Sequence, residues 1–290
     1  MEDFRRIARA ILGVATYRPL CDDTLASLIG EQPYIVKMWV DSLSSVLYRD
    51  HSQNGGIRVR HLSILEFLTS PSAKELRVDL QEANLELSKY CFRKMTSLKF
   101  NICKLETSYL PNSEIKDLGN RVQKNIPDAL QYSSLHWSGH LTSDANLANK
   151  ELCDLLDEFF AGGRPLYWLE ALSLLGNIPA AVSALRLVKK CSKNLTERTK
   201  DRVEDTLRFA LAFSTAISTS APHTYISGLA FIPQESILLR DNSRQLSKFL
   251  NVCEGRAKNW PERPGVWKGH TSGIATFSCS SDGLYIVSGS

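Results

Sequence analysis

The sequence predicts a mainly α-helical protein that ends in a short β segment. Apolar residues recur at helical spacing through most of the first 220 residues. The stretch Asn54-Gly55-Gly56 separates two short extended runs, as in a β-hairpin. After residue 220, short extended runs and turn residues replace the helical pattern, so we expect a β region from about Thr224.

The composition is that of a globular protein. The chain has 290 residues, of which 43% are hydrophobic, so it is long enough for a substantial core. Its net charge of +4 is mild, and basic and acidic residues are interleaved, so we expect neither nucleic acid nor a membrane as the partner. The seven cysteines include no CxxC pair, and no run of about 18 apolar residues occurs. We therefore expect a soluble, cytoplasmic protein with free thiols.

Residues 1–70 predict a winged-helix domain, which consists of three helices followed by a β-hairpin. The first helix starts near residue 2, where apolar side chains recur every three or four positions. The second is expected to begin with an Asp22 cap and to stop at Gly30. The third starts near Pro33, a residue suited to the first turn of a helix. The Asn-Gly-Gly stretch then accepts the positive φ angles of the hairpin turn.

Residues 71–220 predict an α-helical domain. The helical pattern breaks at four places: Pro111, Pro127, Gly162-Gly163 and Gly176-Asn177. Between these breaks, leucines and other apolar residues line one side of each helix, as in the stripe of Leu166, Leu169 and Leu172. Stacked antiparallel helices are the expected packing.

The C-terminal part is expected to be β. Residues 221–268 predict an extended linker with β segments. Residues 269–290, "GHTSGIATFSCSSDGLYIVSGS", have a Gly-His opening, an alternating apolar strand, an Asp282-Gly283 turn and a second strand. This order matches the first half of a WD repeat, so we interpret the segment as a truncated first WD repeat. Two expected strands without neighbours would leave strand edges open, which favours self-association.

In order, the segments resemble the region between the nucleotide-binding module and the propeller of fungal NACHT and WD-repeat proteins. These are NLR-like members of the STAND signalling NTPases. The stretches that carry the resemblance are "VRHLSILEFL", "LELSKYCFRKMTSLKFNICKLETSYLPN", "LYWLEALSLLG", "SAPHTYISGLAFIP" and the terminal half repeat. The resemblance implies a winged helix, a helical domain and the start of a propeller.

His61 is the candidate binding residue. In the family that the sequence resembles, a His at the edge of the winged helix contacts the phosphates of bound ADP, and the motif match falls on His61, although Ile64 stands where an aromatic residue is usual. On the residues alone, His61 shares a strand face with Ile57 and Val59, which favours a core or hydrogen-bonded histidine, and we expect no ligand on it in this chain. Ser63 and Glu66 also match a capping box, so a helix is expected to begin right after His61, with Ser63 as its cap.

No residues for catalysis stand out. The sequence contains no GxxxxGK[ST] phosphate loop, GxSxG elbow or HExxH motif. We therefore expect no enzyme activity and no cofactor in this chain; ATP or ADP would bind only if a NACHT module is present upstream. The paired acids Asp22-Asp23 and Asp154 with Asp157-Glu158 fit solvated helix positions.

Two histidines and two tryptophans are further candidate sites. His136 and His140 lie four residues apart, a spacing that could place two metal ligands on one helix face. The sequence offers no third ligand at a comparable spacing, and Gly139 disfavours a stable helix there. We expect pairing between helices and no metal. Trp260 and Trp267 flank the entry to the half repeat, and we expect burial between propeller strands.

A winged-helix nucleic-acid-binding protein is the alternative function. Its recognition helix, residues 33–47, offers only Lys37, which is opposed by Asp41, whereas Arg58 and Arg60 on the hairpin could contact phosphates. The sequence favours a non-catalytic regulatory or scaffold segment of a NACHT-type signalling protein. Its expected partners are other proteins, or the NACHT module and propeller that this stretch lacks.

Overall fold

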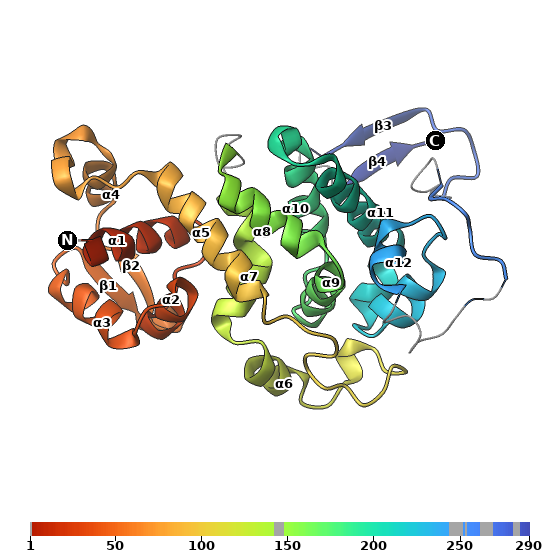
Figure 1. Ribbon diagram of the computed structural model, residues 1–290, viewed down its shortest axis with the longest axis horizontal. Coiled ribbons are helices and arrows are strands. Elements are labelled where there is room, and N and C mark those ends of the chain that lie inside the picture. The colour runs from red at the N-terminus through yellow and green to blue at the C-terminus, as the bar shows by residue number, and fades with distance from the viewer. Residues whose placement is uncertain (1, 142–147, 244–251, 253, 262–268, 281–284) are drawn as a thin grey trace. The chain divides into compact units, whose positions relative to one another are not determined.

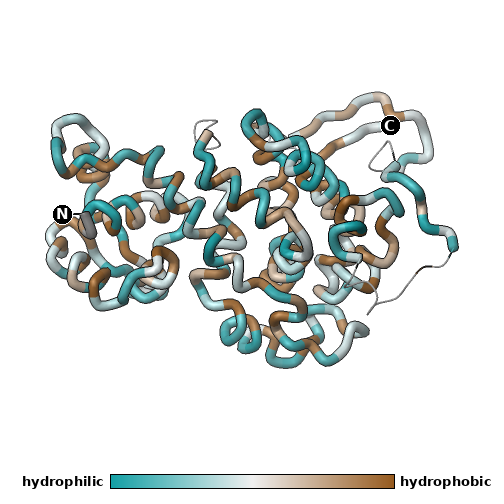
Figure 2. The backbone as a smooth tube through the Cα atoms, in the orientation of Figure 1, coloured by the Kyte–Doolittle hydropathy of each residue, from teal (hydrophilic) through white to brown (hydrophobic). Residues whose placement is uncertain are grey.

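The structure is a computed structural model that describes residues 2–141, 148–243, 252, 254–261, 269–280 and 285–290 (Figure 1). It is mainly helical and ends in a short antiparallel sheet, which confirms the predicted fold class. The chain divides into two compact units, residues 1–260 and residues 261–290. Along the helices of the first unit, hydrophobic and hydrophilic residues alternate, as expected for helices that bury one side each (Figure 2).

Three helices and a hairpin form the N-terminal part, as predicted. They are α1 (Glu2–Ala15), α2 (Asp22–Ile29), α3 (Pro33–Ser42), β1 (Leu47–Asp50) and β2 (Gly56–Val59). The two strands pair antiparallel, and the turn residues Asn54 and Gly55 have φ angles of 53° and 70°. Glycine and asparagine tolerate this left-handed conformation, which explains why the turn was predictable.

Two predicted N-caps are wrong. Cys21 is the N-cap of α2, so Asp22 lies inside the first turn. The next helix, α4 (Leu62–Thr69), begins at Leu62 with His61 as its N-cap. His61 is still extended, with φ −136° and ψ 136°, and the helix begins at the following residue. Ser63 therefore occupies the second helical position, and the predicted capping box does not form.

The helices that follow build the core. They are α5 (Leu80–Met95), α6 (Leu118–Asn125), α7 (Asp128–His136), α8 (Lys150–Phe160), α9 (Arg164–Leu174), α10 (Pro179–Lys190) and α11 (Glu197–Thr219). Helix α5 contacts α1 and α2 as well as α7 and α8, so it links the N-terminal part to the later helices. The breaks predicted at Gly162 and Gly176 are confirmed, with φ angles of 71° and 69°. Trp137 and Trp168 are fully buried in this core.

The β region predicted from Thr224 is wrong for the residues up to Asp241. These residues form a π-helical turn, η7 (Thr224–Leu229), and a short helix, α12 (Ile237–Asp241). Short apolar runs suit a buried helix as well as a strand, so their pattern alone cannot distinguish the two. Both elements contact α11.

The second unit contains the predicted pair of strands. Strand β3 (Thr276–Cys279) pairs antiparallel with β4 (Ile286–Gly289), and Phe277 lies opposite Ser288. Phe277 and Val287 are 72% and 74% exposed. The predicted Asp282-Gly283 turn and Trp267 lie outside the described residues. The finer domain boundaries, 1–70, 71–220, 221–268 and 269–290, stay predictions.

Candidate functional site

His61 lies at the surface. It follows β2 and caps α4 through its backbone, and its side chain makes no capping hydrogen bond. Its exposed position does not fit the core histidine that the alternation of Ile57 and Val59 allowed. The ADP-contacting role that the resemblance implies for His61 stays a prediction.

The arginines of the hairpin bind groups within the protein. The Arg58 guanidinium lies 2.9 Å from the Asp50 carboxylate. Arg60 donates to the backbone carbonyl of Ser44 at 2.9 Å and lies over the Tyr48 ring. These contacts occupy the side chains that the nucleic-acid alternative required, and that alternative gains no support from them.

His136 and His140 help to join the N-terminal part to the helical core. His140 is fully buried, its Nδ1 lies 2.8 Å from the Asn84 Oδ1 on α5, and its Nε2 lies 2.9 Å from the Tyr132 hydroxyl on α7. Because the Asn84 oxygen can only accept, His140 donates from Nδ1, and Nε2 accepts from Tyr132. Tyr17, which follows α1, completes the arrangement; its ring packs edge-on against His140 with centroids 5.0 Å apart. We call these five residues the His140 joint.

Desolvation keeps the joint neutral. Burial, followed by the charge of Arg18, lowers the pKa of His136 to about 4. Burial, followed by interaction with His136, lowers the pKa of His140 to about 3. Among the described residues, no three His, Cys, Asp or Glu side chains are grouped to hold a metal.

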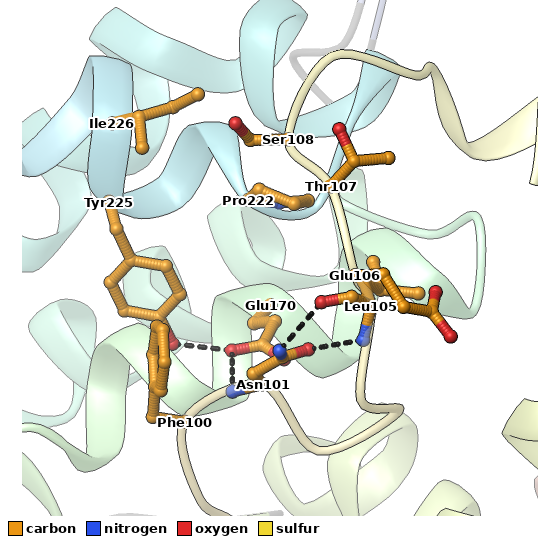
Figure 3. A pocket seen from close by; sticks show the side chains of 10 residues that line it. All are labelled: Phe100, Asn101, Leu105, Glu106, Thr107, Ser108, Glu170, Pro222, Tyr225 and Ile226. Carbon is orange, nitrogen blue, oxygen red and sulfur yellow. Dashed lines mark hydrogen bonds between the residues drawn. The ribbon is translucent and has the colours of Figure 1, made fainter.

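A second buried centre surrounds the side chain of Glu170 on α9 (Figure 3). Glu170 is only 2% exposed. Its Oε2 accepts from the Asn101 amide at 3.0 Å and from the Tyr225 hydroxyl at 2.5 Å. Its Oε1 accepts from the Ile102 amide at 2.9 Å. One carboxylate thus holds the loop after α5 and the π-helical turn η7 against α9. We call these four residues the Glu170 clamp.

The electrostatics of the clamp are unusual because its charge is buried. Burial raises the pKa of Glu170 to about 7, although the hydrogen bonds from Tyr225, Ile102 and Asn101 act in the opposite direction. Burial, and then the neighbouring Glu170 charge, also raises the pKa of Tyr225. Every hydrogen-bond partner recorded for Glu170 among the described residues is a neutral donor. A buried carboxylate without an opposite charge is costly and favours protonation.

The clamp borders a pocket of about 190 Å³. Apolar side chains form much of its wall: Phe100, Leu105, Pro222, Tyr225 and Ile226. Phe100 packs edge-on against Tyr225, with ring centroids 4.8 Å apart, and it is 46% exposed. The hydroxyl-bearing residues Thr107 and Ser108 also line the pocket. It is therefore an open apolar space with one acidic group in its wall.

A larger apolar space lies beside α4. It measures about 420 Å³, and α1, α3, the hairpin and α4 all contribute to its lining, in which Ser63 is the one polar residue among those described. None of the residues of α4 is buried, although five of the eight are apolar. Leu62 and Phe67 are 69% and 47% exposed. We call this space the α4 groove.

Trp260 has a different environment from the one predicted. Its indole Nε1 donates to the Asp205 carboxylate on α11 at 2.5 Å, and its ring packs against Phe213. It therefore contacts a helix and does not lie between propeller strands. The buried carboxylate of Asp205 also accepts from Ser236 and from the Leu238 amide, so it fixes the segment before and within α12.

Comparison with known proteins found one distant similarity to report. The chain is 28% identical over 173 residues to the vegetative incompatibility protein HET-E-1 of Podospora anserina. The match covers 57% of this chain and 13% of that protein. No family model matches the chain, and no solved structure matches it. The similarity supports a distant relationship to the NLR-like fungal NACHT and WD-repeat proteins, without placing the chain in a particular region of them.

The clamp, the joint and the groove were only partly visible in the sequence. Glu170 interrupts an apolar stretch of α9 as a single charge, which signals a buried or paired carboxylate, but its partners are up to 69 residues away.

None of the helices in the described ranges has the length and apolar character that a bilayer crossing needs.

Proposed function

We propose that this chain is a non-catalytic regulatory and scaffold segment of a NACHT-type signalling protein. It would act through contacts with other proteins or with other parts of its own protein. The similarity to HET-E-1, which is named for vegetative incompatibility, supports a signalling role. The absence of a phosphate loop from the sequence supports a non-catalytic one.

The α4 groove is the observation that carries the proposal. Close-packed protein interiors have few voids larger than a water molecule, whereas binding pockets typically measure about 300–1,000 Å³. The groove falls in the second class at about 420 Å³. Exposed apolar surface of this kind marks contact sites for proteins or ligands. An exposed Phe67 beside the groove therefore favours a partner that supplies apolar side chains.

Site-specific photo-crosslinking in fungal cells tests this role. A photoreactive phenylalanine analogue is placed at Phe67 of the full chain, and the same analogue at Tyr109 serves as the control, because Tyr109 is 94% exposed and does not line the groove. We expect one discrete protein adduct from position 67, to a partner or to another part of the same protein. Identical adducts from both positions, or none, would reject the groove as a contact site.

A nucleotide assay tests the non-catalytic part. We expect the purified chain to show no ATP turnover above buffer and no thermal stabilisation by ATP or ADP. Nucleotide at about a hundred times its dissociation constant would stabilise a binding protein by about 3 kcal/mol, so binding would be easily detected. Stabilisation that disappears in a His61→Ala variant would instead favour a nucleotide sensor.

The β3–β4 hairpin provides a second contact surface. Apolar residues are exposed on both strands, and a two-stranded hairpin is at best marginally stable alone. Self-association through its edges is expected to be weaker in a chain that ends at Trp260 than in the full chain. Equal sedimentation behaviour of the two would exclude the hairpin as a self-association surface.

A further inference from the structure

The pocket beside the Glu170 clamp has the composition of a binding site for an organic cation. A carboxylate can accept about four hydrogen bonds, and three donors to Glu170 are recorded, two on Oε2 and one on Oε1. All three donors are neutral groups. The negative charge of Glu170 therefore lies in the wall of an open space without an ion pair among the described residues.

The rest of the lining is suited to an alkyl chain with a positive end. Aromatic and aliphatic side chains face the space, as Figure 3 shows for Tyr225, Phe100 and Ile226. No Lys or Arg is among the described residues that line it. The second acid of the lining, Glu106, is paired 2.8 Å from Arg121. Aromatic rings and an unneutralised carboxylate both attract a cation, and the attraction increases where water is excluded.

The pocket is held in shape by its own backbone. Asn101 and Lys104 have φ angles of 47° and 53°, in the left-handed region that ordinary residues rarely adopt. The Asn101 side chain stabilises this loop by bonding both the amide and the carbonyl of Leu105, at 2.7 Å and 2.9 Å. Backbone conformations of this kind persist where surrounding contacts fix them, and they concentrate at binding sites.

We propose that this pocket binds a primary alkylammonium group, with the ammonium donating to Glu170 and the alkyl chain lying between Phe100 and Ile226. The pocket volume of about 190 Å³ equals the liquid volume of about six water molecules, enough for a group the size of one side chain. The group belongs either to a free small amine or to a lysine of another protein. The inference does not depend on the scaffold role of the chain.

Ligand-observed NMR with the full chain tests the proposal. The probes are n-butylammonium and its neutral counterpart n-butanol, at matched ionic strength. A hydrogen bond to a charged group typically changes affinity by at least about tenfold, so we expect butylammonium to bind about tenfold more tightly than butanol. Since the pKa of Glu170 is about 7 and the amine stays protonated, binding should be several-fold tighter near pH 8 than near pH 6. The probes N-acetyl-lysine methylamide and its norleucine equivalent distinguish a lysine side chain from a free amine.

Three variants complete the test. Glu170→Gln should remove the preference for the cation, and Ile226→Trp should fill the pocket and prevent binding while leaving the clamp bonds in place. Glu158→Gln is the matched control and should bind as the unmodified chain does, because Glu158 is paired with Arg164 and does not line the pocket. If Glu170→Gln does not fold, the pH comparison and Ile226→Trp decide the matter. Equal affinities for butylammonium and butanol, no detectable binding, or unchanged binding in Ile226→Trp would overturn the proposal.

Discussion

The His140 joint is built around a buried base, and the Glu170 clamp is built around a buried acid. Each connects segments distant in sequence through one buried titratable side chain, and each side chain is satisfied by neutral hydrogen-bond partners. The histidine is neutral when it is unprotonated, so burial lowers its pKa. The glutamate is neutral when it is protonated, so burial raises its pKa. Burial disfavours the charged form in both places.

The difference has a consequence for stability. His140 binds fewer protons in the folded state than in the unfolded state, so its contribution falls as the solution becomes acidic. Glu170 binds more protons in the folded state, so its contribution falls as the solution becomes alkaline. The two centres therefore limit the stability of the same unit from opposite sides of neutral pH.

The largest expected effect is the loss of the clamp itself. Glu170→Leu leaves two backbone amides and the Tyr225 hydroxyl without their acceptor. Unsatisfied buried groups cost about 1–3 kcal/mol each, so we expect the free energy of unfolding to fall by roughly 3–5 kcal/mol near pH 6. Urea unfolding followed by circular dichroism measures it. Glu106→Ala, which removes a surface ion pair, should leave it nearly unchanged. Similar losses in both variants would show that the clamp bonds contribute little.

The next effect is the pH dependence that Glu170 imposes. With a pKa of about 7 in the folded state and an ordinary value of 4.5, its stabilising contribution is complete below about pH 4.5 and is lost as the pH rises through 7. The difference of pKa corresponds to roughly 3 kcal/mol over this range. Unfolding measured at several pH values should show this slope in the unmodified chain and lose it in Glu170→Gln. Parallel curves for the two proteins would contradict the assignment.

The joint should give the opposite slope. Because the pKa of His140 falls from 6.5 to about 3, its contribution is present above pH 6.5 and decreases as the pH falls below that value. At about pH 5 the loss is roughly 2 kcal/mol. His136, beside Arg18 and Tyr132, acts in the same direction. In His140→Gln the difference in stability between pH 5 and pH 6.5 should shrink; an unchanged difference would mean that His140 is not the group that titrates.

The sequence could predict local features of this fold better than its buried polar centres. The hairpin turn and the helix end at Gly176 depend on positive φ angles, which the residue types themselves indicate. The prediction of a strand from Thr224 is wrong, because a short apolar run also fits a helix packed on α11. The predicted capping box at Ser63 does not form. The helix starts at Leu62, directly after the extended His61, so Ser63 already lies inside the helix and cannot be its N-cap.

The candidate sites depend on contacts between distant segments. The spacing of His136 and His140 drew attention to the joint, but the asparagine that binds His140 lies 56 residues earlier. Nothing near Glu170 in the sequence indicates that Tyr225, 55 residues later, donates to it. A lone charge in an apolar helix signals that a partner exists, and only the packing of α9 against the loop and η7 identifies the partner.

The smallest expected effect compares one hydroxyl from each centre. Tyr225→Phe removes a donor to the Glu170 carboxylate, whereas Tyr17→Phe removes a donor to the neutral carbonyl of Gly139 at 2.5 Å. Hydrogen bonds to charged groups contribute about 1.5–3 kcal/mol and neutral ones about 1 kcal/mol, so Tyr225→Phe should cost more near pH 8. Below pH 7 the glutamate gains a proton, and the two costs should converge, which urea unfolding at about pH 5.5 and pH 8 can measure. If Tyr225→Phe has the same cost at both pH values, Glu170 does not change its charge in this range, and the contrast between the two centres is wrong.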